Sequence, residues 1–310
     1  MNSDQICNDL REIATRLRVH SLRSTAEAGS GHPTSCLSAA DITAALFFEV
    51  MRYDFQNPQN PDSDRFILSK GHAAPLLYSV WVEAGVLEET ELMNLRRFGS
   101  DLEGHPTPRS KWVDVATGSL GQGLSVGVGM ALSAKFLDNS KSRTFVLMGD
   151  GETAEGSVWE AAAMASYYQL GNIQVVVDIN RLGQSQETMH GWALDSYSQK
   201  FSGFGWHTIS IDGHDFSQIL DAFKEAEAVK DCPVAILAQT KKGQGVSFLE
   251  DKDGWHGKAL KKGDQLDNAL KELPITGGSI SPGKISKSSE VLMDEEKVSI
   301  QSVAKPDYAI

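Results

Sequence analysis

Two short polar stretches, each at the end of an apolar run, carry side chains that could bind a metal ion. Gly149-Asp150-Gly151 follows the run 144–148, and Asp178-Ile179-Asn180 ends the run that begins at 173. The carboxylate of Asp150 and the amide oxygen of Asn180 are hard ligands that suit Mg²⁺, which keeps a phosphate as a further partner. The glycines let the backbone approach that phosphate, and a helix after the turn would direct N–H groups at it. The pair therefore predicts a diphosphate held through Mg²⁺.

Other phosphate-binding classes fit these residues less well. Taken alone, Gly-Asp-Gly is more often an ordinary turn between a strand and a helix, but its pairing with the second stretch favours a ligand site. A P-loop requires GxxxxGK followed by Ser or Thr, and a dinucleotide fold requires GxGxxG near the N-terminus. Neither is present, which disfavours a kinase or a dehydrogenase.

Four of the eight histidines lie in glycine-flanked loops beside expected helix starts. A ligand can reach such loops, and four imidazoles in one kind of context predict a site that handles protons and hydroxyl groups near neutral pH. They lack the HExxH spacing of a zinc site. These four are His32, His72, His105 and His256. The other four have no such context, and we interpret them as structural: His20, His190, His207 and His214.

Alternating strands and helices must position these residues. We expect strands over 65–69, 144–148, 173–179, 207–212 and 233–240, and helices over 4–28, 38–51, 73–83, 158–168, 216–229 and 258–272. A further step from strand to loop to helix is expected at 118–123, with a small-residue helix that ends at Ala134. This alternation predicts an α/β fold with a doubly wound, mainly parallel sheet flanked by helices. The carboxyl ends of neighbouring strands would then meet in the crevice where ligands bind.

Composition limits the function classes. The chain has 310 residues, 41% of them hydrophobic, which is enough for a folded core, and a net charge of −12, which disfavours nucleic acid and anionic membranes as partners. Cys7, Cys36 and Cys232 form no CxxC pair, which is typical of free thiols in a reducing compartment. The N-terminus lacks the apolar core of a secretory signal, and no apolar run spans a membrane. We therefore expect a cytoplasmic protein.

Several stretches, in order, are similar to one known family. GSGHPTS, SKGHAAP, EGHP, TGSLGQG, GDGETAEG, VVVDINRLGQS and GWHGK together resemble the amino-terminal, diphosphate-binding half of a transketolase. The resemblance implies a thiamine diphosphate-binding fold of the diphosphate (PP) type over 1–273. Residues 274–310 would form a linker or a flexible C-terminal tail. The pyrimidine-binding and C-terminal domains of a full transketolase would be absent.

The resemblance also implies roles for individual residues. Mg²⁺, or Ca²⁺ or Mn²⁺ in its place, would be held by Asp150, Asn180 and the carbonyl of Leu182. Thiamine diphosphate would contact the residues Ser35, His72, Gly118, Ser119, Leu120, Gly151, Asn180, Lys242 and His256. The catalytic histidines His32, His105 and His256 would face the sugar. Glu155 would lie at a dimer interface and couple two active sites.

The implied reaction transfers a two-carbon ketol unit from a ketose phosphate to an aldose, as in the pentose phosphate pathway, with the cofactor as electron sink. Activity would require a separate partner chain with the pyrimidine-binding domain, in a homo- or hetero-oligomer. One alternative is another thiamine diphosphate enzyme, such as a 1-deoxyxylulose-phosphate synthase or a dehydrogenase E1 component. Another is a non-catalytic regulatory pseudo-subunit.

Overall fold

The computed structural model describes residues 3–276 and contains one five-stranded sheet in which every pairing is parallel. The strand order is β1-β2-β3-β5-β4. The strands are β1 (Arg65–Leu68), β2 (Thr144–Gly149), β3 (Ile173–Ile179), β4 (His207–Asp212) and β5 (Val234–Gln239). This confirms the predicted α/β class with a parallel sheet.

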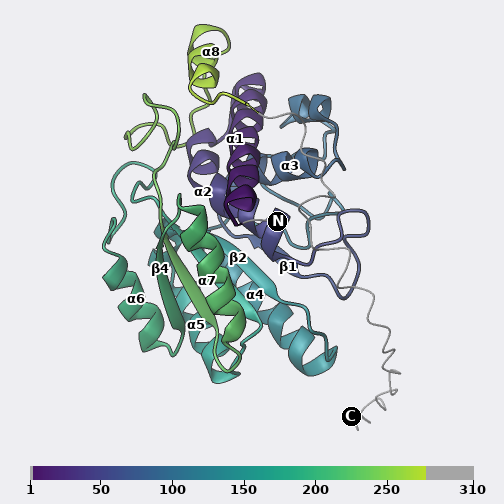
Figure 1. Ribbon diagram of the computed structural model, residues 1–310, viewed down its shortest axis with the longest axis vertical. Coiled ribbons are helices and arrows are strands. Elements are labelled where there is room, and N and C mark those ends of the chain that lie inside the picture. Colours follow the sequence, from purple (N-terminus) through teal and green to yellow (C-terminus); the bar gives the residue numbers. More distant parts are fainter. Residues whose placement is uncertain (1–2, 277–310) are drawn as a thin grey trace, which may run out of the picture.

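Helices cover both faces of the sheet (Figure 1). They are α1 (Ser3–Ala28), α2 (Pro33–Ala45), α3 (Ala74–Glu83), α4 (Gln122–Leu132), α5 (Gly156–Tyr167), α6 (Leu194–Gly203), α7 (Phe216–Ala228) and α8 (Asp264–Lys271). Short 3₁₀ or π turns are η1 (Leu46–Val50), η2 (Gly71–Ala73), η3 (Glu89–Asn94), η4 (Ser133–Leu137) and η5 (Asp150–Ala154).

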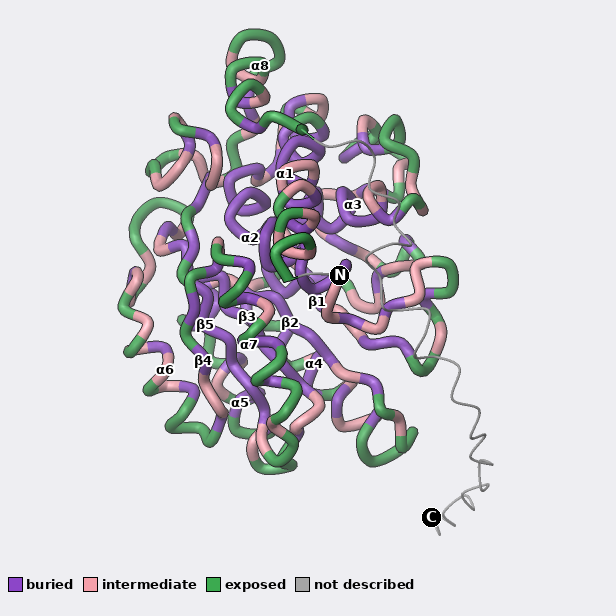
Figure 2. The backbone as a smooth tube through the Cα atoms, viewed as in Figure 1, coloured by how far each residue is buried: buried purple, intermediate pink, exposed green. Residues whose placement is uncertain are grey.

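The core is divided into two layers by the period-two alternation of the strands. In β2, Phe145 and Leu147 face the layer of α1, α2, α3 and α7, whereas Val146 and Met148 face the layer of α4, α5 and α6. Every residue of α2 is buried. Figure 2 shows buried backbone concentrated in the sheet and in α1 and α2, with the outer helices more exposed.

The carboxyl ends of the strands bring the predicted site segments together. β2 and β3 pair so that Gly149 lies opposite Asp178. The loop after β1 is tied to β2, because the Ser69 N–H donates to the Leu147 carbonyl at 2.8 Å. Beyond β5, the Thr240 N–H donates to the Ile179 carbonyl at 3.0 Å. The sheet therefore fixes the segments after β1, β2, β3 and β5 at one edge.

Several predicted boundaries were wrong. The helix expected from Ser38 begins at Pro33, because proline suits the first helical turn and does not have to end the preceding loop. Of the helix expected over 258–272, only α8 forms. It cannot begin earlier, because Gly263, directly before it, has a φ of +84°, which lies outside the helical range. The strand expected before Gly118 does not form, because residues 84–121 contain no strand. Helix α6 was not anticipated, because it buries only Tyr197 and Phe201 in a polar sequence.

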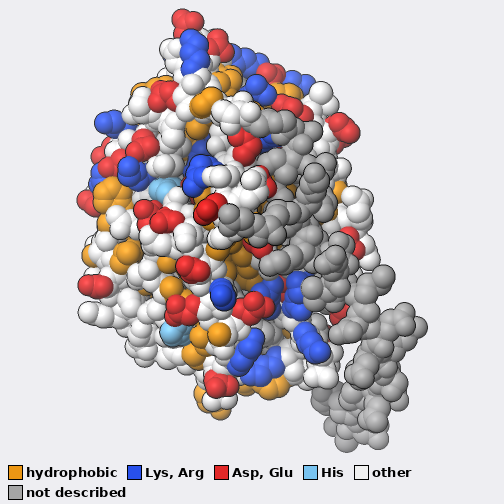
Figure 3. Space-filling model, viewed as in Figure 1, with side chains coloured by type: hydrophobic (Ala, Val, Ile, Leu, Met, Phe, Trp, Pro, Cys, Tyr) orange, Lys and Arg blue, Asp and Glu red, His pale blue; other side chains and the backbone are white. Residues whose placement is uncertain are grey.

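Three further features of the described chain concern its charges, its helices and its cysteines. Acidic and basic side chains are intermingled on the face drawn in Figure 3. None of the helices within residues 3–276 combines the length and apolar character that a membrane span requires. The three cysteines are free thiols. Of the predicted tail 274–310, residues 277–310 lie outside the described part.

Candidate functional site

Three of the four loop histidines meet above the carboxyl edge of the sheet. His32 precedes α2, His72 lies in η2 after β1, and His256 lies in the loop that leads to α8. Their ring centroids are 5.0 Å apart for His32 and His72, 4.8 Å for His32 and His256, and 5.4 Å for His72 and His256. Segments far apart in the sequence thus form one triangle of imidazoles, which we call the histidine triad.

Burial keeps the histidine triad neutral. It lowers the pKa of His32 to about 4 and that of His256 to about 3, and nearby cationic groups add to the effect. The pKa of His72 is also held well below its usual range, again by burial first and then by Lys70. Nδ1 of His32 is buried and has no hydrogen-bond partner within residues 3–276. Neutral rings with a free nitrogen can accept or donate a hydrogen bond to a ligand.

His105 lies beside this triad, on the loop that leads from η3. Its ring packs against Gly118, since a Cβ added to that glycine would lie 3.0 Å from the His105 Cδ2. Burial lowers the pKa of His105, and the charge of Arg96 lowers it further. The same guanidinium acts on His32. Arg96 is exposed and has no ion-pair partner in the described chain, so it places a positive charge at the mouth of the site.

Asp150 is buried at the end of β2 with 4% of its surface exposed. Its carboxylate accepts hydrogen bonds from the N–H groups of Gly151 and Arg181, both at 2.8 Å, and from the Thr188 hydroxyl at 3.0 Å. Within residues 3–276 no lysine or arginine forms an ion pair with it. Burial raises its pKa to about 6, and the neighbouring Asp178 charge contributes. A cation would therefore find an uncompensated carboxylate here.

Asn180 and Leu182 lie on the segment that continues β3. The Asn180 Oδ1 accepts the Leu182 N–H at 3.3 Å, and the Leu182 carbonyl accepts the Lys242 ammonium at 2.7 Å. Lys242 also donates to the Gly183 carbonyl at 3.1 Å and lies 2.9 Å from Nδ1 of His256. Burial lowers the pKa of Lys242 to about 8, and Lys70 adds to the shift. A buried ammonium with only neutral partners suits an anionic ligand.

The described part of the chain contains no metal cluster built from side chains alone. Within the described residues, no three His, Cys, Asp or Glu side chains are arranged to bind an ion together. A metal at Asp150 would thus depend on amide and carbonyl oxygens, which the sequence pattern predicts for Asn180 and the resemblance implies for Leu182.

The sequence did not reveal a buried ion pair beneath the site. The Lys70 ammonium contacts the Asp178 carboxylate and donates to the Ser35 carbonyl at 3.0 Å. Lys70 is 1% and Asp178 0% exposed. Asp178 also accepts hydrogen bonds from Thr240 and, at 2.7 Å, from Ser38. This buried ion pair therefore joins the segments that carry His72, Ser35, Asn180 and Lys242. In the sequence, the feature that could have indicated the pair is a lysine directly after a buried strand.

Gly118, Ser119 and Leu120 lie between the histidine triad and α4. Gly118 packs closely on the loop of His72, because a Cβ on Gly71 would lie 2.8 Å from the Gly118 nitrogen. Ser119 is exposed, and Gly118 and Leu120 are half-buried. Gly151 has open space, since a Cβ there would meet only Thr188, at 3.8 Å. Glu155 is exposed at the start of α5 and packs against Gly121, because a Cβ on that glycine would lie 2.6 Å from the Glu155 Cβ.

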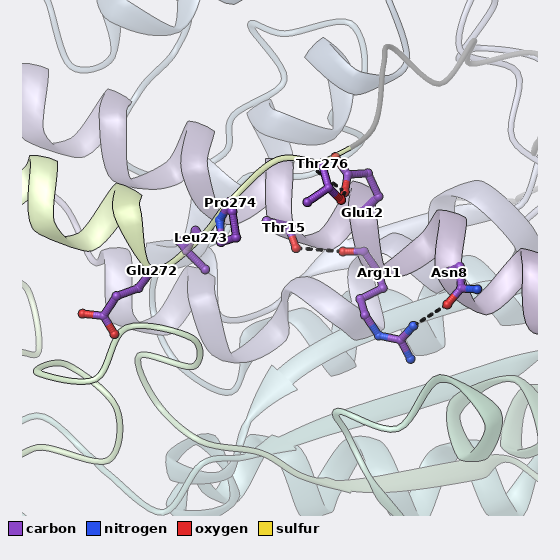
Figure 4. Close-up of a pocket in the computed structure, with 8 residues that line it drawn as sticks. All are labelled: Asn8, Arg11, Glu12, Thr15, Glu272, Leu273, Pro274 and Thr276. Atoms are coloured by element: carbon purple, nitrogen blue, oxygen red, sulfur yellow. Dashed lines mark hydrogen bonds between the residues drawn. The ribbon is translucent and has the colours of Figure 1, made fainter.

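A separate pocket of about 410 Å³ lies between α1 and the chain after α8 (Figure 4). In Figure 4 the segment from Glu272 to Thr276 runs beside α1, with Arg11 hydrogen-bonded to Asn8. None of the predicted site residues lines this pocket.

The family comparison decides the identity of this fold. The family model described as "Transketolase, thiamine diphosphate binding domain" matches residues 10–275. The chain belongs to the transketolase family. Its parallel sheet and helical layers are thus those of a transketolase thiamine diphosphate-binding domain, and the sequence resemblance is confirmed.

Curated relatives are similar over most of this transketolase domain. Transketolase-like protein 2 of Bos taurus is 49% identical over 303 residues, which cover 97% of this chain and 48% of that protein. Transketolase of Homo sapiens is 54% identical over 253 residues, 82% of this chain and 40% of that protein. The chain thus spans less than half the length of these relatives.

Solved transketolase structures share the fold. The transketolase of Pichia stipitis in complex with sedoheptulose-7-phosphate superposes with a TM-score of 0.82 at 30% identity, covering 91% of this chain and 44% of that chain. The enzyme of Campylobacter jejuni gives a TM-score of 0.79 at 30% identity, covering 92% and 45%.

Proposed function

We propose that this transketolase domain binds thiamine diphosphate with a divalent cation and supplies one half of a transketolase active site. The observation that carries the proposal is the meeting of the histidine triad, Asp150 and Lys242 at one edge of the sheet. When bound, thiamine diphosphate supplies the electron sink for the transfer of a two-carbon ketol unit. The chain's own residues must bind, orient and exchange protons.

The donor set suits a diphosphate and Mg²⁺. Asp150 offers a buried anionic oxygen without a cationic partner, and Asn180 and Leu182 offer neutral oxygens nearby. Mg²⁺ accepts such oxygen ligands together with phosphate oxygens. Lys242 and His256 would face the diphosphate. The space beside the Gly151 Cα would let the backbone approach the same group, while the Gly151 N–H donates to Asp150.

The neutral histidines suit the sugar. His32 and His256, with His105 beside them, can donate or accept hydrogen bonds to hydroxyl groups, because their pKa values lie below neutral pH. Arg96 adds a positive charge that favours a phosphorylated substrate. We therefore infer a ketose phosphate donor and an aldose acceptor.

A partner surface lies on α4, η4 and α5, which pack side by side (Figure 1). Large apolar side chains are exposed there: Phe136 at 56%, Leu137 at 81%, Met164 at 46% and Tyr167 at 79%. Exposed apolar patches mark interaction sites. Glu155 lies at the other end of α5, where the helix begins. We propose that the pyrimidine-binding part of a transketolase, on a partner chain, packs along α4 and α5 from this apolar end to Glu155 and completes the site there.

The test is reconstitution. The chain is mixed with a chain that carries a pyrimidine-binding domain, thiamine diphosphate, Mg²⁺, a ketose phosphate and an aldose, and ketol transfer is measured. Failure of every such partner to give transfer, together with absent cofactor binding, would reject the proposal.

The metal assignment has its own test. Asp150→Ala removes the anionic ligand, so Mg²⁺-dependent thiamine diphosphate binding in calorimetry should be lost. Asp221→Asn, on the exposed side of α7, is the matched control and should bind normally. Retained binding in Asp150→Ala would show that the cation lies elsewhere.

A further inference from the structure

A chain of buried polar contacts connects α1 to the loop that carries Lys242. The Arg18 guanidinium of α1 donates to both carboxylate oxygens of Asp41 in α2, and its Nε donates to the Leu37 carbonyl at 3.2 Å. Arg18 and Asp41 are 6% and 4% exposed. The Asp41 carboxylate also lies 2.8 Å from Nδ1 of His214. The buried pair thus holds the imidazole from one side.

The other side of the His214 ring holds a backbone group. Its Nε2 lies 2.9 Å from the Lys241 N–H, which donates to it. Because a carboxylate faces Nδ1 and an N–H donor faces Nε2, the ring is neutral with its proton on Nδ1. The backbone N–H of His214 donates to the Asp212 carboxylate at 2.9 Å. This bond fixes the loop that presents the ring.

The Lys241 amide is the point at which the chain leaves the sheet. Thr240 is still held by the Ile179 carbonyl of β3, and Lys242 already reaches the Leu182 carbonyl and His256. The Thr240–Lys241 peptide, which carries the Lys241 N–H, therefore sets the direction in which the chain continues to Lys242 and enters the site.

We propose that His214 is a positioning residue. Its Nε2 orients the Thr240–Lys241 peptide, which precedes Lys242, while Asp41 and Arg18 fix the tautomer of the ring. The inference rests on the proposed function only for the role of Lys242 toward the diphosphate. It revises the interpretation of His214 as purely structural, because the ring contacts the backbone of Lys241, which precedes the site residue Lys242.

Two substitutions distinguish the contact of Nδ1 with Asp41 from the contact of Nε2 with the Lys241 N–H. In His214→Asn the side-chain amide can replace Nδ1 toward Asp41, but nothing replaces Nε2. In His214→Gln the longer amide can bring its oxygen to the Lys241 N–H. We expect exchange of the Lys241 amide with deuterium to be about tenfold faster in His214→Asn, the value of one lost hydrogen bond, and close to wild type in His214→Gln. Thr240 is the internal reference and should not change in either.

A second readout is the ¹⁵N resonance of the His256 imidazole, which reports its contact with the Lys242 ammonium. It should shift in His214→Asn and stay in place in His214→Gln. The matched control is His207→Asn, which breaks a histidine–carboxylate contact to Glu225 at the opposite end of β4 and should move neither readout. If His214→Asn does not fold, His214→Ala is compared with His214→Gln in the same way.

The outcomes distinguish the two proposals. Unchanged Lys241 exchange and an unchanged His256 resonance in His214→Asn would overturn the positioning role, whatever the protein binds. If these readouts change as expected, the affinity for thiamine diphosphate with Mg²⁺ in the complex with the partner chain should fall in His214→Asn and recover in His214→Gln. Absence of cofactor binding by the wild type would reject the proposed function and leave the exchange result intact.

Discussion

Replacing Lys70 with methionine tests whether the buried ion pair beneath the site stabilises the fold by its charge. The substitution keeps most of the length of the side chain but leaves the Asp178 carboxylate, 0% exposed, without its cation. Removing one partner of a buried pair costs about 3–5 kcal/mol, because the remaining charge stays desolvated. A typical domain has a free energy of unfolding of about 5–15 kcal/mol, so we expect a large fall.

The assay is urea unfolding followed by the fluorescence of the six tryptophans. The double variant Lys70→Met/Asp178→Asn removes both charges and keeps an oxygen for Thr240, so it should regain more than half of the lost free energy. Lys262→Met is the matched control. Lys262 lies 2.6 Å from Glu27 but is largely exposed, so its loss should leave the unfolding midpoint nearly unchanged.

Two outcomes would refute this reasoning. One is a loss in Lys70→Met no greater than that in Lys262→Met, which would show that burial does not set the cost. The other is a double variant no more stable than Lys70→Met, which would assign the loss to packing and not to the unpaired charge.

Two further predictions concern pH and glycine. The pKa of His32 is lowered in the folded protein, so as pH falls this histidine binds a proton in the unfolded chain before it does so in the folded one. The free energy of unfolding should therefore decrease as pH drops from about 6.5 toward 4. In His32→Gln, urea midpoints measured across this range should therefore depend less on pH, and an unchanged slope would show that His32 does not contribute. In α4, a Cβ on Gly129 meets nothing within 4 Å, whereas one on Gly123 would lie 2.4 Å from the Ser69 Cβ. Gly129→Ala should stabilise the isolated chain by up to about 1 kcal/mol, and Gly123→Ala should destabilise it in the same assay. Equal effects would contradict the packing described for Ser69.

Much of the fold could be predicted because the signals were local. The β-branched run 173–179 forms β3 with the predicted bounds, and both faces of that strand are covered. Helix α6 and the start of α2 could not be read in this way. Tyr197 and Phe201 are the only buried residues in α6, and Pro33 is compatible with both a loop and a helix start.

The residues of the candidate site also divide into those that the sequence indicated and those that it did not. The sequence indicated Asp150 and Asn180, since both follow apolar runs, and it indicated the four histidines by their glycine-flanked loops. It assigned no role to Lys70, Asp178 or Arg96, and it led us to interpret His214 as structural. Each of these acts through a contact with a segment far away in the chain, so no local spacing reports it.

The sequence by itself determined the alternation of strands and helices, the family resemblance and the residue types available for chemistry. Those properties depend on periodicity and on short motifs, which are independent of distant contacts. Only the tertiary structure decided which of these residues meet and in what state. It placed three histidines within 5.4 Å of one another, and burial then made them neutral. It also left Asp150 without a cation and gave His214 its connection to Lys242, because desolvation and long-range hydrogen bonds exist only after the chain has folded.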